Sequence, residues 1–234
     1  MCDSCGSCEA CELKRSHKAI NILDSDTSGD VVNKYKLTYF AIKAIAEPIR
    51  YLLNYGGIQF EDVRIKRDTW INHKPDMPFG QVPVLEVNGK KVHQSLAICR
   101  YLGKQLKING NTDWEDLEID SMADTINDLR AKIALYHYET DEEVKKSRKL
   151  PLYVETLPFY LERFEAIAKS NDGHLAIGKL TWVDFYFAGL IDYFNYMLEK
   201  NIIEDYPHLK EVINNVVGIP SVKEWIERRP LSEC

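Results

Sequence analysis

The stretch Pro78–Gly89, with the sequence PFGQVPVLEVNG, decides the fold of this 234-residue chain. Val84–Val87 is a short β-branched run, and Asn88-Gly89 is a dipeptide typical of two-residue hairpin turns. We therefore expect Val92–Gln94 to return as a second strand. A proline cannot donate into a strand ladder, so pairing should stop at Val82-Pro83. The N–H and C=O of Val82 are then available to an extended peptide ligand.

The residues around this hairpin extend the pattern in both directions. Downstream, Ser95 stands where an N-cap would open an apolar helix. Upstream, Lys36–Phe40 and Phe60–Ile65 read as strands. Between them, Ile45, Ile49, Leu52 and Leu53 share one helix face, and Trp70–Pro75 is expected to be a loop. The predicted order is strand, helix, strand, loop, hairpin, helix.

Composition sets the class of protein. A hydrophobic content of 45% can supply a real core,. The net charge of −6 and pI near 5.6 argue against a nucleic-acid-binding surface,. No apolar run reaches the roughly 18 residues of a membrane span, and the N-terminus has no secretory h-region. We therefore expect a cytoplasmic protein with reduced cysteines, without nucleic-acid or membrane partners.

The second half of the chain reads as helical. Residues 108–113 form the expected linker, and residues 114–234 are expected to be an all-helical domain. Thr181-Trp182-Val183-Asp184 has the form of a capping box, in which each end residue bonds the backbone of the other. Trp182–Phe187 is apolar and predicts a central, buried helix. Asp184 is therefore expected to serve folding and not catalysis.

Four of the six cysteines, Cys2, Cys5, Cys8 and Cys11, occupy a polar segment, residues 1–32, expected to be a disordered extension,. Three interpretations stay open: incidental thiols, a zinc or iron–sulfur site, and acylation. Cys99 is expected to be a buried apolar residue, and Cys234 to be exposed.

Several motifs make the region from about Asn33 to Pro230 resemble the sigma class of cytosolic glutathione transferases, especially the insect type. They are Leu37–Phe40, the pair Trp70 and Lys74, His93–Ser95, Trp114–Leu117, Asp124–Asp128 and Gly178–Asp184. The resemblance implies an α/β thioredoxin-like N-terminal domain, residues 33–107, followed by an all-α C-terminal domain. It also implies a homodimer, glutathione as co-substrate and no further cofactor.

The resemblance assigns catalysis to Tyr39. Glutathione is a tripeptide whose thiol has a pKa of about 8.5, whereas the thiolate is the reactive nucleophile. A hydrogen bond donated to the thiolate lowers that pKa, and a phenol with a pKa near 10 stays protonated and can donate it.

The remaining site residues follow from the charges of the tripeptide. Lys74 and Trp70 would bind the glycyl carboxylate, and Val82, before a cis Pro83, would pair with the cysteinyl unit. Gln81, Gln94 and Ser95 would hold the γ-glutamyl end, and Asp128 would reach its ammonium from the partner subunit. Aromatic side chains are expected to line the electrophile pocket: Phe40, Tyr138 and Tyr193 first, with Tyr136 and Tyr196 as further candidates.

Two positions depart from sigma relatives that make prostaglandin D. Ile45 stands in place of an arginine, whose role would be lost or taken over through Lys43. Asn127 replaces one aspartate of an interface cluster that includes Asp124 and Asp128, so no metal is expected there.

We expect a glutathione transferase acting on hydrophobic electrophiles such as lipid-peroxidation aldehydes, with possible glutathione peroxidase activity. The alternatives are a prostaglandin D synthase-like isomerase and a crystallin-like structural protein on the same fold.

Overall fold

The computed structural model describes residues 33–232 and residue 234. The predictions for the cysteine-containing segment, residues 1–32, lie outside the described residues. Within the described part, no helix has both the length and the apolar character that a membrane span requires.

Four strands form one mixed sheet with the order β2-β1-β3-β4. The central strand β1 (Tyr35–Phe40) runs parallel to β2 (Phe60–Ile65) and antiparallel to β3 (Val84–Val87). The edge strand β4 (Lys90–His93) pairs antiparallel with β3 across the Asn88-Gly89 turn, where both residues have positive φ, as a two-residue hairpin requires,.

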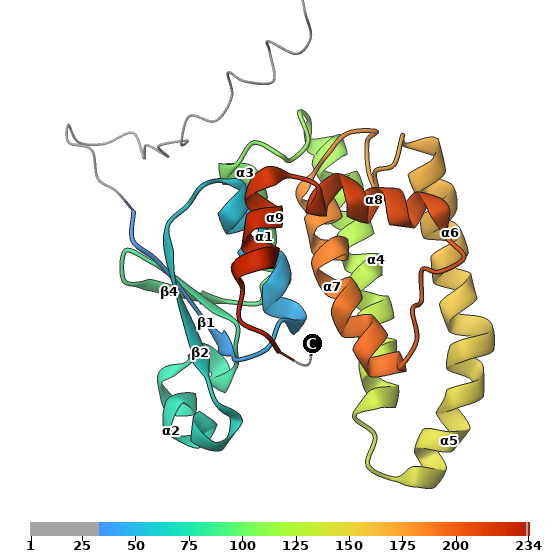
Figure 1. Cartoon of the computed structure of the whole chain (residues 1–234), viewed down its shortest axis with the longest axis horizontal. Coiled ribbons are helices and arrows are strands. Elements are labelled where there is room, and N and C mark those ends of the chain that lie inside the picture. Colours follow the sequence, from blue (N-terminus) through green and yellow to red (C-terminus); the bar gives the residue numbers. More distant parts are fainter. Residues whose placement is uncertain (1–32, 233) are drawn as a thin grey trace, which may run out of the picture.

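Two helices, α1 (Glu47–Tyr55) and α3 (Ser95–Gln105), lie between this sheet and the helical half of the molecule (Figure 1). Pro48 lies in the first turn of α1, where its missing N–H is tolerated,. The strand–helix–strand unit, the hairpin and the closing helix confirm the thioredoxin-like arrangement.

The second half is entirely helical and contains α4 (Asp113–His137), α5 (Glu142–Pro151), α6 (Leu157–Ser170), α7 (Trp182–Leu198), α8 (Pro207–Val217) and α9 (Pro220–Arg228). A π-helical turn, Leu152–Thr156, joins α5 to α6. Helix α7 packs against α1, α3, α4 and α8. Every residue of Trp182–Ile191 is buried, which confirms the predicted central helix. Helix α9 returns beside α1 (Figure 1).

The predicted capping box is present at the start of α7. The Asp184 carboxylate accepts hydrogen bonds of 2.8 Å from the backbone N–H groups of Thr181 and Leu175. Both Thr181 and Asp184 are completely buried. Asp184 therefore satisfies backbone donors at the entrance to the most buried helix.

The close approach of α7 to the thioredoxin-like half depends on two glycines. A Cβ at Gly189 would lie 2.6 Å from the backbone N of Pro48, and one at Gly103 would lie 2.4 Å from the Trp182 ring. No side chain fits at either position without displacing a neighbour.

Four expectations about local structure are corrected. The return strand is Lys90–His93 instead of Val92–Gln94, because the tight turn pairs Val87 directly with Lys90. Gln94, with φ of 77°, occupies the N-cap of α3, and Ser95 is already helical. The expected loop Trp70–Pro75 is helical instead: it lies in α2 (Trp70–His73) and the 3-10 turn Lys74–Asp76. Further 3-10 turns, Arg67–Thr69 and Pro78–Gly80, flank it.

The fourth correction concerns Cys234, which is 4% exposed and not open to solvent. Its backbone oxygen accepts a hydrogen bond from Lys43 N–H, which brings the end of the described chain back to the thioredoxin-like half (Figure 1). Cys99 is completely buried, as predicted.

Candidate active site

Strand register brings three predicted site segments to one end of the sheet. Thr38 is paired with Val84, and Val84 is paired in turn with His93. Tyr39 follows Thr38, Pro83 precedes Val84 and Gln94 follows His93. These three residues therefore lie at the same end of the sheet. The Val82-Pro83 peptide bond there is cis, as the resemblance implied.

A pocket of about 430 Å³ opens beside Tyr39. Its lining joins residues from both halves: Tyr39, Phe40, Ile42, Arg67, Trp70, Tyr138 and Tyr193. The structure thus brings together the predicted catalytic tyrosine, one predicted glutathione contact and the three favoured residues of the electrophile pocket.

The phenol of Tyr39 is held in its protonated form. Tyr39 is 6% exposed, and burial, followed by the nearby Tyr138, raises its pKa well above the ordinary tyrosine value. The Arg50 guanidinium and a hydrogen bond from the backbone N–H of Ile45 act in the opposite direction but do not outweigh burial. At neutral pH the Tyr39 hydroxyl is therefore a hydrogen-bond donor facing the pocket residues.

Two further hydroxyl groups lie in the same pocket. The oxygens of Tyr138 and Tyr193 are 2.8 Å apart, and either group can be the donor. Burial and the Tyr138 hydroxyl raise the pKa of Tyr193, so this group also stays protonated. The Phe40 ring, also in the lining, packs edge-on against Trp70, with a centroid distance of 5.3 Å. The pocket is mainly aromatic with a few donors, a composition suited to an apolar ligand that carries a polar atom.

The described residues lining this pocket do not include the other predicted glutathione contacts, which lie around the end of the sheet. A Cβ at Gly80 would lie 3.1 Å from Lys74 Cε, so the Lys74 chain lies over the backbone next to Gln81. Ser95, at the start of α3, is hydrogen bonded to the Tyr186 hydroxyl.

Asp128 is exposed on α4, and the described residues around the Tyr39 pocket do not include it. The neighbouring Asn127 uses its side-chain oxygen to accept hydrogen bonds from Arg130 Nε at 2.8 Å and from the Tyr186 hydroxyl at 3.4 Å. Among the residues that the structure describes, no group of three or more His, Cys, Asp or Glu side chains is arranged to hold a metal ion.

Other candidates lie elsewhere. Tyr136 packs edge-on against Tyr153, and Tyr196 packs against His137, so neither belongs to the pocket lining described above. Lys43, through which the role of an arginine at position 45 was expected to be taken over, has its ammonium bound to Asp192 Oδ2 at 2.7 Å on α7. At position 45 itself, the backbone N–H contacts the Tyr39 hydroxyl.

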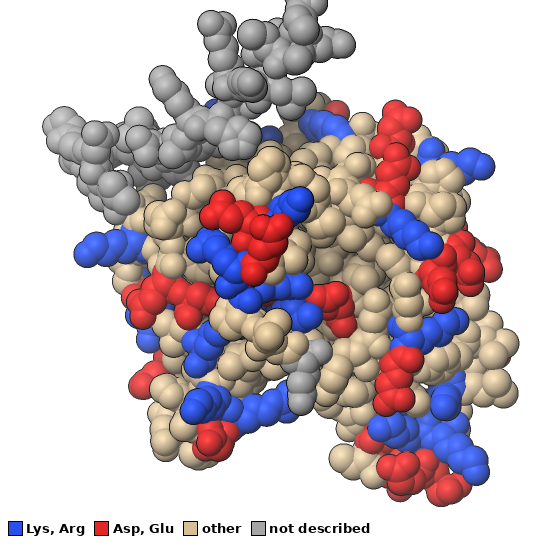
Figure 2. Space-filling view, viewed as in Figure 1, with Lys and Arg blue, Asp and Glu red and all other residues tan. Residues whose placement is uncertain are grey.

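Sequence reasoning missed two lining residues, Ile42 and Arg67. The Arg67 guanidinium lies 5.9 Å from the centre of the Phe40 ring, a cation–π distance,. Arg67 falls in a helical turn that periodicity cannot detect. On the face shown in Figure 2, basic and acidic side chains are interspersed without a single-sign patch.

Comparisons with known proteins agree with this geometry. A family model for the glutathione S-transferase N-terminal domain matches residues 35–104, and one for the C-terminal domain matches residues 127–229. Glutathione S-transferase S1 of Drosophila melanogaster is 52% identical over 203 residues, which cover 87% of this chain and 82% of that protein. A glutathione S-transferase of Anopheles gambiae is 51% identical, covering 85% of this chain and 98% of its own length.

Among solved structures, prostaglandin synthase D of Nilaparvata lugens matches with a TM-score of 0.82 and 47% identity, covering 85% of this chain and all of its own. Family models match both halves of this chain, and relatives share about half of their residues with it. The chain therefore belongs to the glutathione S-transferase family.

Proposed function

We propose that this protein is a sigma-class glutathione transferase of the insect type, which works as a cytoplasmic homodimer and joins glutathione to hydrophobic electrophiles such as lipid-peroxidation aldehydes. The observation that carries the proposal is the protonated Tyr39 phenol in an aromatic pocket shared with Tyr138 and Tyr193. Reduction of organic hydroperoxides is part of the proposal: the bound thiolate would take one oxygen and release the alcohol, and a second glutathione would then form the disulfide and water.

Tyr39 would donate its hydroxyl hydrogen to the sulfur of bound glutathione. This bond is stronger to the thiolate than to the thiol, so it lowers the thiol pKa, and each unit corresponds to about 1.4 kcal/mol. The thiolate would then form a bond to the β-carbon of an unsaturated aldehyde, the C=C π pair would move to give an enolate, and the enolate would take a proton from water. The Tyr138 and Tyr193 hydroxyls are 2.8 Å apart, and one of them donates to the other. The hydroxyl that accepts in this pair keeps its own hydrogen, which it can donate to the aldehyde oxygen as negative charge develops there.

The end of the sheet offers partners for the whole tripeptide. Strand pairing of β3 begins at Val84, so the Val82 backbone ahead of it can form the antiparallel pair with the cysteinyl unit,. Lys74 and Trp70 would bind the glycyl carboxylate. Gln81, Gln94 and Ser95 would bind the γ-glutamyl carboxylate near the start of α3, an eleven-residue helix,.

The proposed dimer supplies the remaining contact. Asp128 is exposed on its own chain, so a partner's Tyr39 site can be within reach of its carboxylate. Apolar side chains on the thioredoxin-like half support an interface there: Phe79 is 86% exposed and Val92, on the edge strand, is 47% exposed,.

Replacement of Tyr39 by phenylalanine tests the proposal. The thiolate absorbance of bound glutathione should titrate at higher pH, and turnover should fall about 10- to 100-fold, as expected for the loss of a hydrogen bond to a charged group. Glutathione binding should change little. Tyr160→Phe, a partly buried tyrosine against Phe164, is the matched control. An unchanged titration in Tyr39→Phe would refute the assignment.

A second candidate is prostaglandin isomerisation, because the solved relative from Nilaparvata lugens is a prostaglandin synthase D. Ile45 argues against it, since an isoleucine side chain cannot donate a hydrogen bond. Assays with an aryl halide, an alkenal, a hydroperoxide and a cyclic endoperoxide would separate the activities. Absence of turnover on all four would favour the crystallin-like structural alternative.

A further inference from the structure

Residues 41–45, called the 41–45 loop below, follow β1 and run into the 3-10 turn Ala44–Ala46, and their backbone needs external support. Ala44 in this loop has φ of 37° and is 1% exposed. A non-glycine residue rarely adopts such a conformation, and it persists only where the surroundings hold it in place. The contacts around the 41–45 loop therefore determine its shape.

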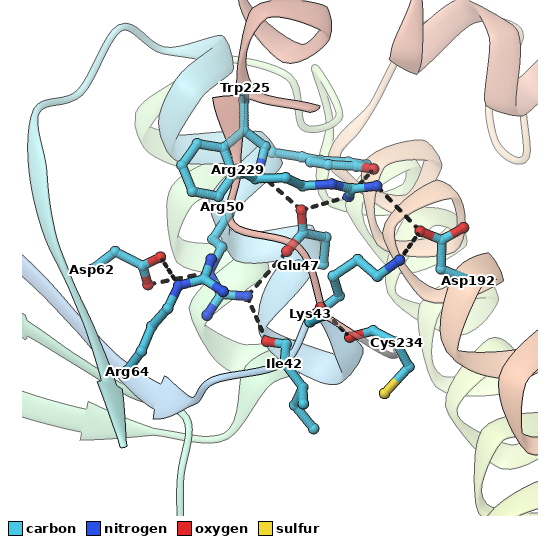
Figure 3. A network of polar contacts seen from close by, with 12 residues as sticks. Ile42, Lys43, Glu47, Arg50, Asp62, Arg64, Asp192, Trp225, Arg229 and Cys234 are labelled. Atoms are coloured by element: carbon cyan, nitrogen blue, oxygen red, sulfur yellow. Dashed lines mark hydrogen bonds and ion pairs between the residues drawn. The ribbon is translucent and has the colours of Figure 1, made fainter. Parts of the chain in front are cut away.

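Three contacts hold the loop from different sides. Arg50 Nη1 donates to the Ile42 carbonyl at 2.9 Å. The backbone oxygen of Cys234 accepts from Lys43 N–H, and Lys43 Nζ is bound to Asp192 Oδ2 at 2.7 Å on α7. Figure 3 shows these anchors meeting at the loop from α1, from α7 and from the chain beyond α9.

The anchors are themselves fixed by a network of buried charges. Arg50 is completely buried and pairs with Glu47 at 3.0 Å and with Asp62 at 3.1 Å. Glu47 also accepts from Trp225 Nε1 and from Arg229 Nη1, each at 2.8 Å (Figure 3). Opposite charges alternate through the network, so each buried charged group has at least one partner of opposite charge, although Arg50 Nη2 makes no hydrogen bond among the described residues. These pairs leave the anchors little freedom to move.

The loop ends at the group that contacts the catalytic phenol. The backbone N–H of Ile45 donates to the Tyr39 oxygen. A phenol has one hydrogen to donate, and accepting from Ile45 leaves this hydrogen directed to another partner. On the proposed function, that partner is the glutathione sulfur.

We propose that Arg50, the Lys43–Asp192 ion pair and the backbone of Cys234 position Tyr39: they hold the 41–45 loop so that Ile45 N–H orients the Tyr39 hydroxyl toward the glutathione sulfur. The inference rests on the proposed role of Tyr39. In this proposal the Ile45 backbone donates the hydrogen bond that an isoleucine side chain cannot donate. Cys234, which is remote in sequence from Tyr39, then contributes to activation of the glutathione thiol.

Two variants loosen the anchors without touching the pocket. One is a chain that ends at Pro230, which lacks the Cys234 anchor. The other is Asp192→Asn, which weakens the hold on Lys43 and changes a carboxylate that is 46% exposed. Asp205→Asn, an exposed aspartate before α8, is the matched control. The readouts are the pKa of the bound glutathione thiol, from its thiolate absorbance, and the split between kcat and the KM for glutathione.

The direction in which the pKa of the bound glutathione thiol shifts distinguishes a loss of loop anchoring from a change in local charge. Both variants remove negative charge near the site, and this change alone would lower the thiol pKa. An upward shift therefore requires a loss of Tyr39 orientation. We expect an upward shift and a fall in kcat of roughly three- to tenfold, the effect of one weakened hydrogen bond, with the KM for glutathione nearly unchanged.

If the chain that ends at Pro230 folds, it is the deciding variant. If it does not fold, Asp192→Asn is the deciding variant. An unchanged or lowered thiol pKa in the deciding variant, or an equal rise in Asp205→Asn, would overturn the inference. Tyr39→Phe measured alongside distinguishes the two levels of the proposal. If Tyr39→Phe raises the thiol pKa and the deciding variant does not, only the positioning role fails. If Tyr39→Phe has no effect, the proposed function fails and the positioning role fails with it.

Discussion

Replacement of Asp184 by alanine should cost more stability than replacement of any exposed aspartate. Its carboxylate is completely buried and accepts from the N–H groups of Leu175 and Thr181, each at 2.8 Å. A buried donor without an acceptor costs about 1–3 kcal/mol, so two such donors give an expected loss of about 2–6 kcal/mol. Domains are stable by about 5–15 kcal/mol in total, so the loss is large.

Urea unfolding at a fixed protein concentration measures this loss, since dimerisation would make the midpoint concentration-dependent. The melting temperature should fall by at least about 5 °C in a chain of this size. Asp113→Ala is the matched control: Asp113 also lies in the first turn of a helix, but it is exposed, and it should cost less than about 1 kcal/mol,. Equal losses in the two variants, or lost thiol activation in folded Asp184→Ala, would refute the reasoning.

Three further predictions concern the dimer, pH and glutathione binding. Heterodimers that combine Asp128→Ala with Tyr39→Phe subunits should keep about half of the activity if Asp128 acts across the interface and the sites are independent; near-complete loss would place both residues in one subunit's site. The Asp184 carboxylate, 3.7 Å from His174 Nδ1, raises the pKa of the imidazole in the folded state through an ion pair. This stabilisation is complete below the unfolded pKa of about 6.5 and is lost as pH rises through the folded pKa, so the melting temperature should exceed that of His174→Gln by more at about pH 6 than at about pH 8.5; a constant difference would contradict it. Lys74→Ala should raise the KM for glutathione with little change in kcat, and steady-state kinetics in which kcat falls instead would assign Lys74 a different role.

The hairpin and the central helix could be predicted because their signals are local. Asn88-Gly89 specifies its turn through backbone conformation, and the capping box at Thr181 and Asp184 lies within a single helical turn,. The start of α3 was misplaced by one residue because Gln94 adopts a positive φ that is uncommon for its residue type,.

The site could be predicted only where a family motif covers it. Tyr39, Tyr138 and Tyr193 meet in one pocket, although Tyr138, directly after α4, and Tyr193, on α7, are far along the chain from Tyr39. Arg67 and the buried Cys234 were missed because their places depend on contacts between distant segments, and no periodicity records such contacts,.

The buried network around Glu47 limits which thioredoxin-like and helical halves of related enzymes can be recombined. Glu47 belongs to the thioredoxin-like half, yet two of its partners, Trp225 and Arg229, belong to the helical half. A chimera that joins this thioredoxin-like half to a foreign helical half without equivalents of both partners would bury an unbalanced carboxylate. Diversification by recombination is therefore restricted to donors that carry this tryptophan and this arginine.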